Sequence, residues 1–413
     1  MIIFSMLAAA GLLSTGLSNS DSLFARAERQ LRAQEARLIA FRRDLHQHPE
    51  ISLQEERTAA KVAERLKELG LEVRTGVGGH GVVAILRGAK PGPMVAYRAD
   101  MDAVPSNEPD PVEFKSLTAG VRHICGHDLH TTIGVAIAEG LAAQRKDMAG
   151  SIMLIFQPAE ERVLGARAML KDGVFSAQKP VAIYGVHTAP LNVGQLGTRP
   201  GPMMAAIDQL RITITGSGDL AKVADSARKL ITAVSTITMQ QALQGAATLT
   251  SDGLPVDALI ANAITRPGEN GAMGVFGSVS SASAEAREAA RKRITTGLAG
   301  LGSSSVQVKV DWEERFSSGV QNDVPLMERA NAAIRVAIGK EAAVTVPVAP
   351  PVFSEDYGFF TEQVPGVFWF LGVSNPAKGT VGMPHSPNYV ADEGAILVAA
   401  RAMTAVMLDR LSR

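Results

Sequence analysis

The chain has 413 residues, of which 46% are hydrophobic, and its 41 basic residues balance its 41 acidic residues. This length favours two domains over one, and the lack of a basic excess argues against nucleic acid or an anionic membrane as the main partner. Small-molecule or peptide chemistry is the better expectation. The only cysteine, Cys125, has no second thiol in the chain with which to form a disulfide.

The N-terminus is apolar, and the first charged side chain is Asp21. Residues 2–13 form an apolar run that is short for a membrane span, which needs about 20 residues. Such a run followed by small residues is typical of a secretory signal, although the usual basic start is missing. We predict a signal peptide at residues 1–20 and a periplasmic or secreted location. A buried N-terminal helix of a cytoplasmic protein is the alternative.

Helix-like and strand-like segments alternate along most of the chain. In chain order, the predicted elements are helices 24–47 and 55–69, strands 71–75, 81–88 and 94–99, helix 131–145, strands 151–157 and 181–187, strand 366–373 and helix 394–411. Strands that alternate with helices predict an α/β domain with helices on both faces of the sheet.

The middle of the chain has a different order. After a strand at 209–216 come a helix over 220–243, two strand-like runs within 247–281, a helix over 281–301 and a strand over 304–312. The order β-α-β-β-α-β predicts a ferredoxin-like module. We expect this module to occupy residues 207–317 and to be inserted into an α/β domain made of residues 24–206 and 318–413.

Polar side chains gather where three predicted strands end. Asp100 and Asp102 follow the first strand, Glu160 and Glu161 follow the second, and His187 ends the third. In open α/β sheets, ligands lie beyond the carboxyl ends of the strands. We therefore predict that these five side chains share one site.

The stretch HICGHDLH, residues 123–130, precedes the predicted helix 131–145. In a loop that enters a helix, Cys125 and His127 can converge, with Asp128 or a neighbour as a candidate cap, and the helix dipole favours a thiolate. Thiolate and imidazole are good ligands for zinc and other transition metals. Two alternatives remain: an inert buried cysteine, or a cysteine nucleophile with His127 or His123 as its base.

The other histidines are expected to differ in role. His385 lies in a loop just before the last helix and can reach the same site. His123 and His130 are expected to support the site rather than bind metal, and His46 and His48 are expected to hold a helix end.

Seven stretches together carry a family resemblance. They are LHQHPEISLQEERTA, YRADMDAVP, HICGHDLHTT, IFQPAEE, GVHTAPLNVGQLGTRPGPMMAA, FSEDYGFF and MPHSPNY. With them the chain resembles the aminoacylase, hippurate hydrolase and auxin-conjugate amidohydrolase family of dinuclear metallopeptidases. The resemblance implies a metallopeptidase catalytic domain with a mixed sheet flanked by helices, plus the inserted ferredoxin-like α+β module as a lid and dimerisation domain.

The resemblance also implies a metal site with two divalent ions per chain, Zn, Mn, Co or Ni. The implied ligands are Cys125, as the bridge, with His127, Glu161, His187 and His385. Glu160 would be the general base acting on a metal-bound water, whose pKa a metal lowers toward ~7. Asp102 would support a ligand or the base, with Asp100 close by. On an extended segment, the adjacent side chains of Glu160 and Glu161 would point to opposite sides, which would separate their roles.

The predicted function is hydrolysis of an amide bond in an N-acyl amino acid or a small peptide-like conjugate, and the alternative is a noncatalytic metal-binding or ligand-binding protein of the same fold. The inserted module departs from the family pattern, because no histidine lies between His187 and His385. Relatives carry one there that helps to bind substrate or to stabilise the oxyanion. The module can use other donors for a different substrate, the enzyme can be slow, or hydrolysis can be lost.

Overall fold

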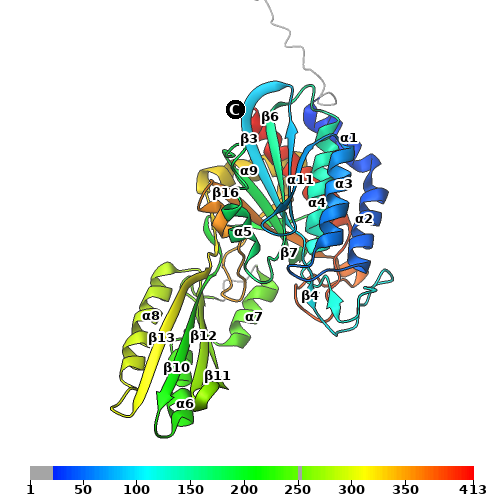
Figure 1. Cartoon of the computed structure of the whole chain (residues 1–413). Helices are drawn as coiled ribbons and strands as arrows, with labels where there is room; N and C mark the ends of the chain where they lie inside the picture. Colours follow the sequence, from blue (N-terminus) through cyan, green and yellow to red (C-terminus); the bar gives the residue numbers. More distant parts are fainter. Residues whose placement is uncertain (1–21, 250–253) are drawn as a thin grey trace, which may run out of the picture.

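The computed structural model describes residues 22–249 and 254–413, so the predicted signal peptide lies outside the described residues. No helix within these two ranges is both long and apolar enough to cross a membrane. The described chain forms two parts, one around an eight-stranded sheet and one around a four-stranded sheet (Figure 1).

The large sheet is mixed and has the strand order β1-β2-β6-β3-β7-β16-β8-β15. Its strands are β1 (Glu72–Val77), β2 (Gly81–Arg87), β3 (Lys90–Asp100), β6 (Ala149–Gln157), β7 (Ile183–Asn192), β8 (Leu196–Thr198), β15 (Ala343–Thr345) and β16 (Gly366–Ser374). The four central strands β6, β3, β7 and β16 run parallel. Their carboxyl ends therefore meet at one edge, as the sequence predicted.

Helices cover both faces of this sheet. They are α1 (Leu23–Ala33), α2 (Glu35–Gln47), α3 (Glu56–Glu68), α4 (His127–Ala142), α5 (Gly165–Lys171), α9 (Val324–Ala337), α10 (Gly358–Thr361) and α11 (Gly394–Leu411). Alternate residues of β3 enter two separate buried clusters: Val95 and Tyr97 pack in one, Met94 and Ala96 in the other. The predicted α/β domain, with both faces of its sheet buried, is confirmed.

Two helix predictions in this part need correction. The helix predicted over 24–47 is two helices, because the chain breaks at Gln34, whose backbone is not helical (φ −100°, ψ 0°). The sequence reading also missed α9, which begins after Asp323. The Asp323 side chain caps this helix by accepting the backbone N–H of Leu326.

The four-stranded sheet has the order β11-β12-β10-β13, and every neighbouring pair is antiparallel. Its elements are β10 (Ala206–Gly216), α6 (Leu220–Thr232), α7 (Met239–Thr248), β11 (Leu259–Pro267), β12 (Met273–Ser281), α8 (Ala284–Ala299) and β13 (Val306–Ser317). This is the order of a ferredoxin-like module, with α6 and α8 packed on one face around a core of its own. The single helix predicted over 220–243 is wrong, because a capping box of Thr238 and Gln241 starts a new helix, α7.

Short elements complete the fold. They are β4 (Val104–Pro105), β5 (Val121–Arg122), β9 (Gly201–Met204), β14 (Val320–Asn322) and the 3-10 helices Glu269–Gly271, Lys340–Ala342 and Pro376–Lys378. Strand β9 precedes the module and β14 follows it, and the two pair antiparallel. The two segments that connect the α/β part to the module are therefore hydrogen-bonded to each other.

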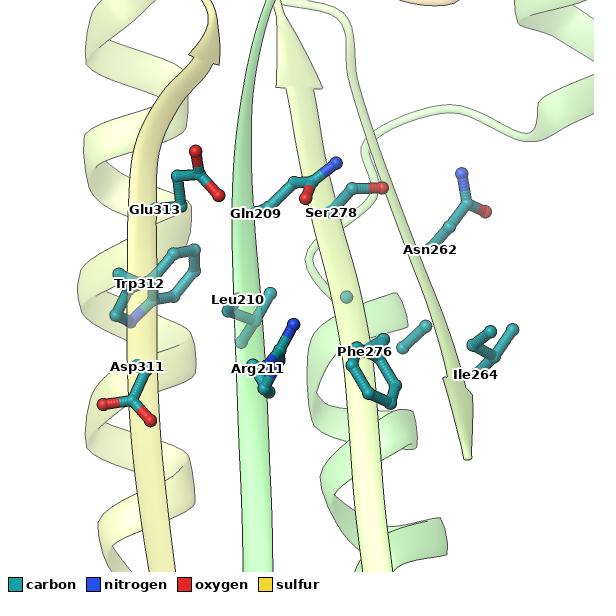
Figure 2. Close-up of a pocket in the computed structure, with 12 residues that line it drawn as sticks. Gln209, Leu210, Arg211, Asn262, Ile264, Phe276, Ser278, Asp311, Trp312 and Glu313 are labelled. Atoms are coloured by element: carbon teal, nitrogen blue, oxygen red, sulfur yellow. The ribbon is translucent and has the colours of Figure 1, made fainter. Parts of the chain in front are cut away.

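The face of the four-stranded sheet opposite its helices is open, and it is hollowed by a groove of about 480 Å³ (Figure 2). Phe276 lies near its centre, with the guanidinium groups of Arg211 and Arg266 at 5.2 Å and 5.9 Å from the ring centroid. Asp311 and Glu313 line its β13 side. No histidine or cysteine lines this groove among the described residues, so it does not offer a mixed set of metal ligands.

The packing of α1 gives a test of the fold. Leu31 is fully buried and lies against Gly140 of α4, whereas Leu243 of α7 is 49% exposed. We expect Leu31→Ala to lower the free energy of unfolding by about 2–5 kcal/mol, and Leu243→Ala to change it by about 0.5 kcal/mol or less. Urea denaturation of both variants measures this, and equal losses would show that α1 does not pack as described.

Candidate active site

The loop that carries Cys125 enters α4 through a glycine. Gly126 caps the helix with a left-handed backbone (φ 92°), and a Cβ there would lie 2.4 Å from the Tyr389 hydroxyl oxygen. Only glycine combines this backbone with this close approach. Of the predicted caps, Asp128 or a neighbour, the neighbour Gly126 is the one observed, and the Asp128 carboxylate instead forms an ion pair with Arg42, with 2.7 Å between oxygen and Nε.

Cys125, His127 and His187 form a buried group whose donor atoms lie within 4.8 Å of one another. The Cys125 Sγ is 3.2 Å from the His187 Nε2. The His187 Nδ1–H donates to the Thr188 carbonyl at 2.8 Å, so the His187 Nε2 keeps its lone pair. The His127 Nδ1 lies 3.3 Å from Asp102, and its Nε2 has no hydrogen-bond partner among the described residues. Both rings are oriented as metal-binding histidines are.

A second group consists of Cys125, Glu161 and His385, again with donor atoms within 4.8 Å of one another. The His385 Nε2 is 3.4 Å from a Glu161 carboxylate oxygen. The His385 backbone N–H donates to the Ile124 carbonyl at 2.8 Å, which holds the late loop against the cysteine loop. The two groups therefore share the Cys125 thiol, and this loop reaches the site as the sequence predicted.

The adjacent glutamates lie on a tight turn after β6. The expectation that they lie on an extended segment is wrong, because Ala159 and Val163 have left-handed backbones (φ 52° and 56°). Asp102 accepts the backbone N–H of Glu160 at 3.1 Å and of Glu161 at 3.0 Å. The turn, rather than strand alternation, gives the two side chains different neighbours.

Glu160 faces a buried network that the sequence reading did not find. Arg98, which is 1% exposed, lies at its centre. Its guanidinium donates to Asp100 at 2.6 Å, to Glu355 at 2.8 Å and to Asp356 at 3.3 Å. Arg98 lies in the motif YRADMDAVP, and Glu355 and Asp356 lie in FSEDYGFF. The sequence signal that could have revealed this network was the acidic pair in an otherwise apolar stretch.

The titratable groups of the site have strongly shifted pKa values. Burial, followed by the nearby Glu355 and Glu161 carboxylates, raises the pKa of Glu160 well above its ordinary value. Burial opposes ionisation of Glu161, but its contacts with His385 and His127 prevail and lower its pKa to about 2. Burial, followed by the Glu161, Glu160 and Asp100 carboxylates, raises the pKa of Cys125, against the expectation from the helix dipole. A cation would be needed to hold the thiolate, which argues against the cysteine nucleophile.

His130 and His123 do not join the two donor groups. Both ring nitrogens of His130 are engaged, since Nδ1 donates to Asp100 at 2.6 Å and Nε2 accepts the Thr188 N–H at 2.9 Å. His123 is buried, and neither of its ring nitrogens has a hydrogen-bond partner in the described part of the chain.

His46 and His48 lie near the end of α2. His48 donates its Nδ1–H to the Asp44 carbonyl at 2.8 Å, as expected for a residue that holds a helix end. The His46 ring also contacts residues outside α2: its Nδ1 lies 2.8 Å from the Asp128 carboxylate and its Nε2 lies 3.0 Å from the Asp110 carboxylate. It thereby joins α2 to the first turn of α4.

A cavity of about 280 Å³ opens onto the shared thiol. Its polar side is formed by Cys125, Glu160, Glu161, His187, Thr188, Ser354 and His385, and its apolar side by Val163, Met204, Val352, Phe353, Phe370 and Pro384. No described residue of the inserted module lines it. A small organic molecule fits a cavity of this size and mixed character.

Comparisons with known proteins agree with this geometry. The model of "Peptidase family M20/M25/M40" matches residues 96–409. The chain belongs to this family. It is 33% identical to N-acetylcysteine deacetylase of Bacillus subtilis, over 88% of this chain and 94% of that protein. It is 30% identical to IAA-amino acid hydrolase ILR1-like 5 of Arabidopsis thaliana, over 91% and 88% of the two chains.

A solved structure of a member of the same family has a similar fold. The YXEP protein of Bacillus subtilis, described as a dinuclear metal binding peptidase from the M20 family, superposes with a TM-score of 0.74 at 30% identity. The match covers 92% of this chain and 99% of that chain. The recognised family and its mixed α/β fold are thus confirmed.

The raised pKa of Glu160 gives a pH prediction. Glu160 is the base that the family resemblance predicts, and a base must be ionised to accept a proton, so we expect activity to be lost as the pH falls through this pKa. Glu355→Gln removes a neighbouring negative charge, so the pKa of Glu160 falls and the acid limb of kcat/KM moves to lower pH by about 0.5–1 unit. The exposed substitution Glu341→Gln is the control and leaves the profile unchanged. A shift to higher pH would contradict the assigned coupling.

Proposed function

We propose that this protein is a metal-dependent amidohydrolase that cleaves the amide bond of N-acyl amino acids or small peptide-like conjugates. The observation that carries the proposal is the pair of donor groups that share Cys125, with Glu160 beside them. Membership of the M20 family and the hydrolase names of its relatives favour hydrolysis over a noncatalytic binding protein.

The residues present fit two divalent cations. The His127 Nε2 and a Glu161 carboxylate oxygen are buried and have no hydrogen-bond partner among the described residues, as expected of atoms reserved for a ligand. In our proposal His127 and His187 would hold one ion, Glu161 and His385 would hold the other, and the Cys125 thiolate would serve both. A thiolate, imidazoles and a carboxylate suit Zn, Mn, Co or Ni. When bound, such ions polarise the scissile carbonyl and acidify water.

Glu160 is the proposed general base. Its carboxylate takes a proton from the attacking water and delivers it to the leaving amine, and a raised pKa suits a group that must do both. Asp102 has two positioning roles: it orients the His127 ring, and it holds the backbone of the turn that carries Glu160. Its contribution is therefore geometric.

The substrate is proposed to be a small N-acyl compound whose apolar part packs on the side of the cavity formed by Met204, Phe353 and Phe370. The module has no histidine to offer, and no described residue of it lines this cavity. This supports a substrate held mainly by the α/β part, rather than by other donors of the module, which was the first of the three explanations raised by the sequence.

Location and assembly are further parts of the proposal. The apolar run at residues 2–13 supports export through a signal peptide at residues 1–20. The family resemblance supports a homodimer formed through the module at residues 207–317. The remainder, residues 24–206 with 318–413, would be the catalytic domain.

The general base is tested by Glu160→Gln. The amide cannot accept the proton, so we expect kcat on N-acyl amino acids to fall by about 100- to 10,000-fold. Metal content should stay at the wild-type value, because Glu160 is not a proposed ligand. Assays with added metals, beside the Glu341→Gln control, measure this. Undiminished hydrolysis by the variant would exclude Glu160 as the base.

The bridge is tested by Cys125→Ser. A serine hydroxyl is a much weaker ligand than a thiolate, so we expect fewer than two ions per chain by elemental analysis after dialysis. The thermal transition of the variant shows whether it is folded. Retention of two tightly bound ions would be evidence against a bridging thiolate.

A further inference from the structure

The turn that carries Glu160 and Glu161 is held by carboxylates through three consecutive backbone N–H groups. Asp102 accepts two of them, from Glu160 and Glu161. The third, from Ala159, donates to the Glu55 carboxylate at 2.8 Å. Ala159 has a left-handed backbone, which costs energy for any residue with a Cβ and needs support from its surroundings.

Glu55 comes from a distant part of the sequence. It is fully buried, and the carboxylate oxygen that binds Ala159 also accepts the Leu53 N–H at 3.0 Å. Its other carboxylate oxygen has no hydrogen-bond partner in the described part of the chain. The neighbouring Ser52 donates its hydroxyl to Asp102 at 2.6 Å. The segment 51–55 therefore supports the turn at two points.

The position of Glu55 makes this contact unusual. Glu55 occupies the N-cap position of α3, yet its side chain makes no capping hydrogen bond. Glu50 does that work instead, by accepting the backbone N–H groups of Arg57 at 3.0 Å and Thr58 at 2.8 Å. The Glu55 side chain is thus free to reach Ala159, 104 residues away.

We propose that Glu55 is a positioning residue for hydrolysis. It fixes the Ala159–Glu161 backbone so that the Glu160 and Glu161 side chains have the positions needed for their proposed roles as base and metal ligand. This rests on the roles proposed above for these two glutamates. The effect is geometric: Glu55 does not line the cavity and does not touch the reacting atoms. Groups that orient metal ligands and bases from behind commonly change affinity or rate by about 10- to 100-fold when removed.

Four variants test the proposal. Glu55→Ala removes the acceptor, so kcat and metal affinity should fall by about 10- to 100-fold, with little change in KM. Glu55→Gln keeps an oxygen at the same reach and should be close to the wild type. Glu55→Asp keeps the charge but is one methylene shorter, so it should resemble Glu55→Ala. Glu50→Ala is the matched control, since it loses a carboxylate that also binds two backbone N–H groups.

The control separates positioning from general stability. We expect Glu50→Ala to lower Tm because α3 loses its cap, while kcat stays within about twofold of the wild type. Hydrogen–deuterium exchange of the Ala159, Glu160 and Glu161 amides should be faster by about tenfold or more in Glu55→Ala and unchanged in Glu50→Ala.

Two results would overturn the proposal. One is normal exchange and normal kcat in a folded Glu55→Ala protein. The other is wild-type kcat and exchange in Glu55→Asp together with a reduced kcat and faster exchange in Glu55→Gln, because the charge of residue 55 rather than its length would then matter. The exchange measurement needs no substrate. If the wild type hydrolysed nothing and bound no metal, the proposed function would fail while the exchange result still decided whether Glu55 holds the turn.

Discussion

The Asp102 carboxylate is fully buried and accepts hydrogen bonds from four groups on three separate parts of the chain. They are the Ser52 hydroxyl, the His127 ring and the backbone N–H groups of Glu160 and Glu161. A buried carboxylate without such partners would be costly, so the fold is constrained to bring these groups together. The relative position of a proposed metal ligand and the proposed base follows from this one side chain.

Charge balance is the second constraint on the site. Arg98 is the central cation among Asp100, Glu355 and Asp356, and Glu160 lies beside them. One guanidinium cannot neutralise this many buried carboxylates, which is why burial and mutual repulsion raise the pKa of Glu160 and bring that of Asp356 to about 8. Bound divalent cations would relieve the same excess. The acidic surroundings thus favour metal binding, and the raised pKa makes Glu160, the proposed base, a stronger proton acceptor once it is ionised.

The sequence predicted much of the catalytic part because local signals were strong there. Buried parallel strands appear in the sequence as short apolar runs. Polar residues at the carboxyl ends of neighbouring parallel strands lie close together at one edge of the sheet. The turn after β6 was beyond this reasoning, since its left-handed Ala159 depends on Glu55 and Asp102, which are distant in the sequence. The Arg98–Glu355 pair spans 257 residues, and no periodicity signals it. The break at Gln34 was missed because helical spacing continues across it.

The inserted module contains no histidine, against the expectation from the family resemblance, and its packing bears on what this means for the site. Leu210, Ile231 and Val275 belong to a buried cluster that contains only residues of the module. Its ties to the rest include the β9–β14 pair and an Arg167–Glu313 ion pair of 3.7 Å. Apart from Leu249, which packs in the cluster of the α/β part with Met204 and Phe370, the module has a core of its own, and no described residue of it lines the cavity around Cys125. The lack of a histidine in the module is therefore compatible with a complete set of proposed ligands and a proposed base in the α/β part.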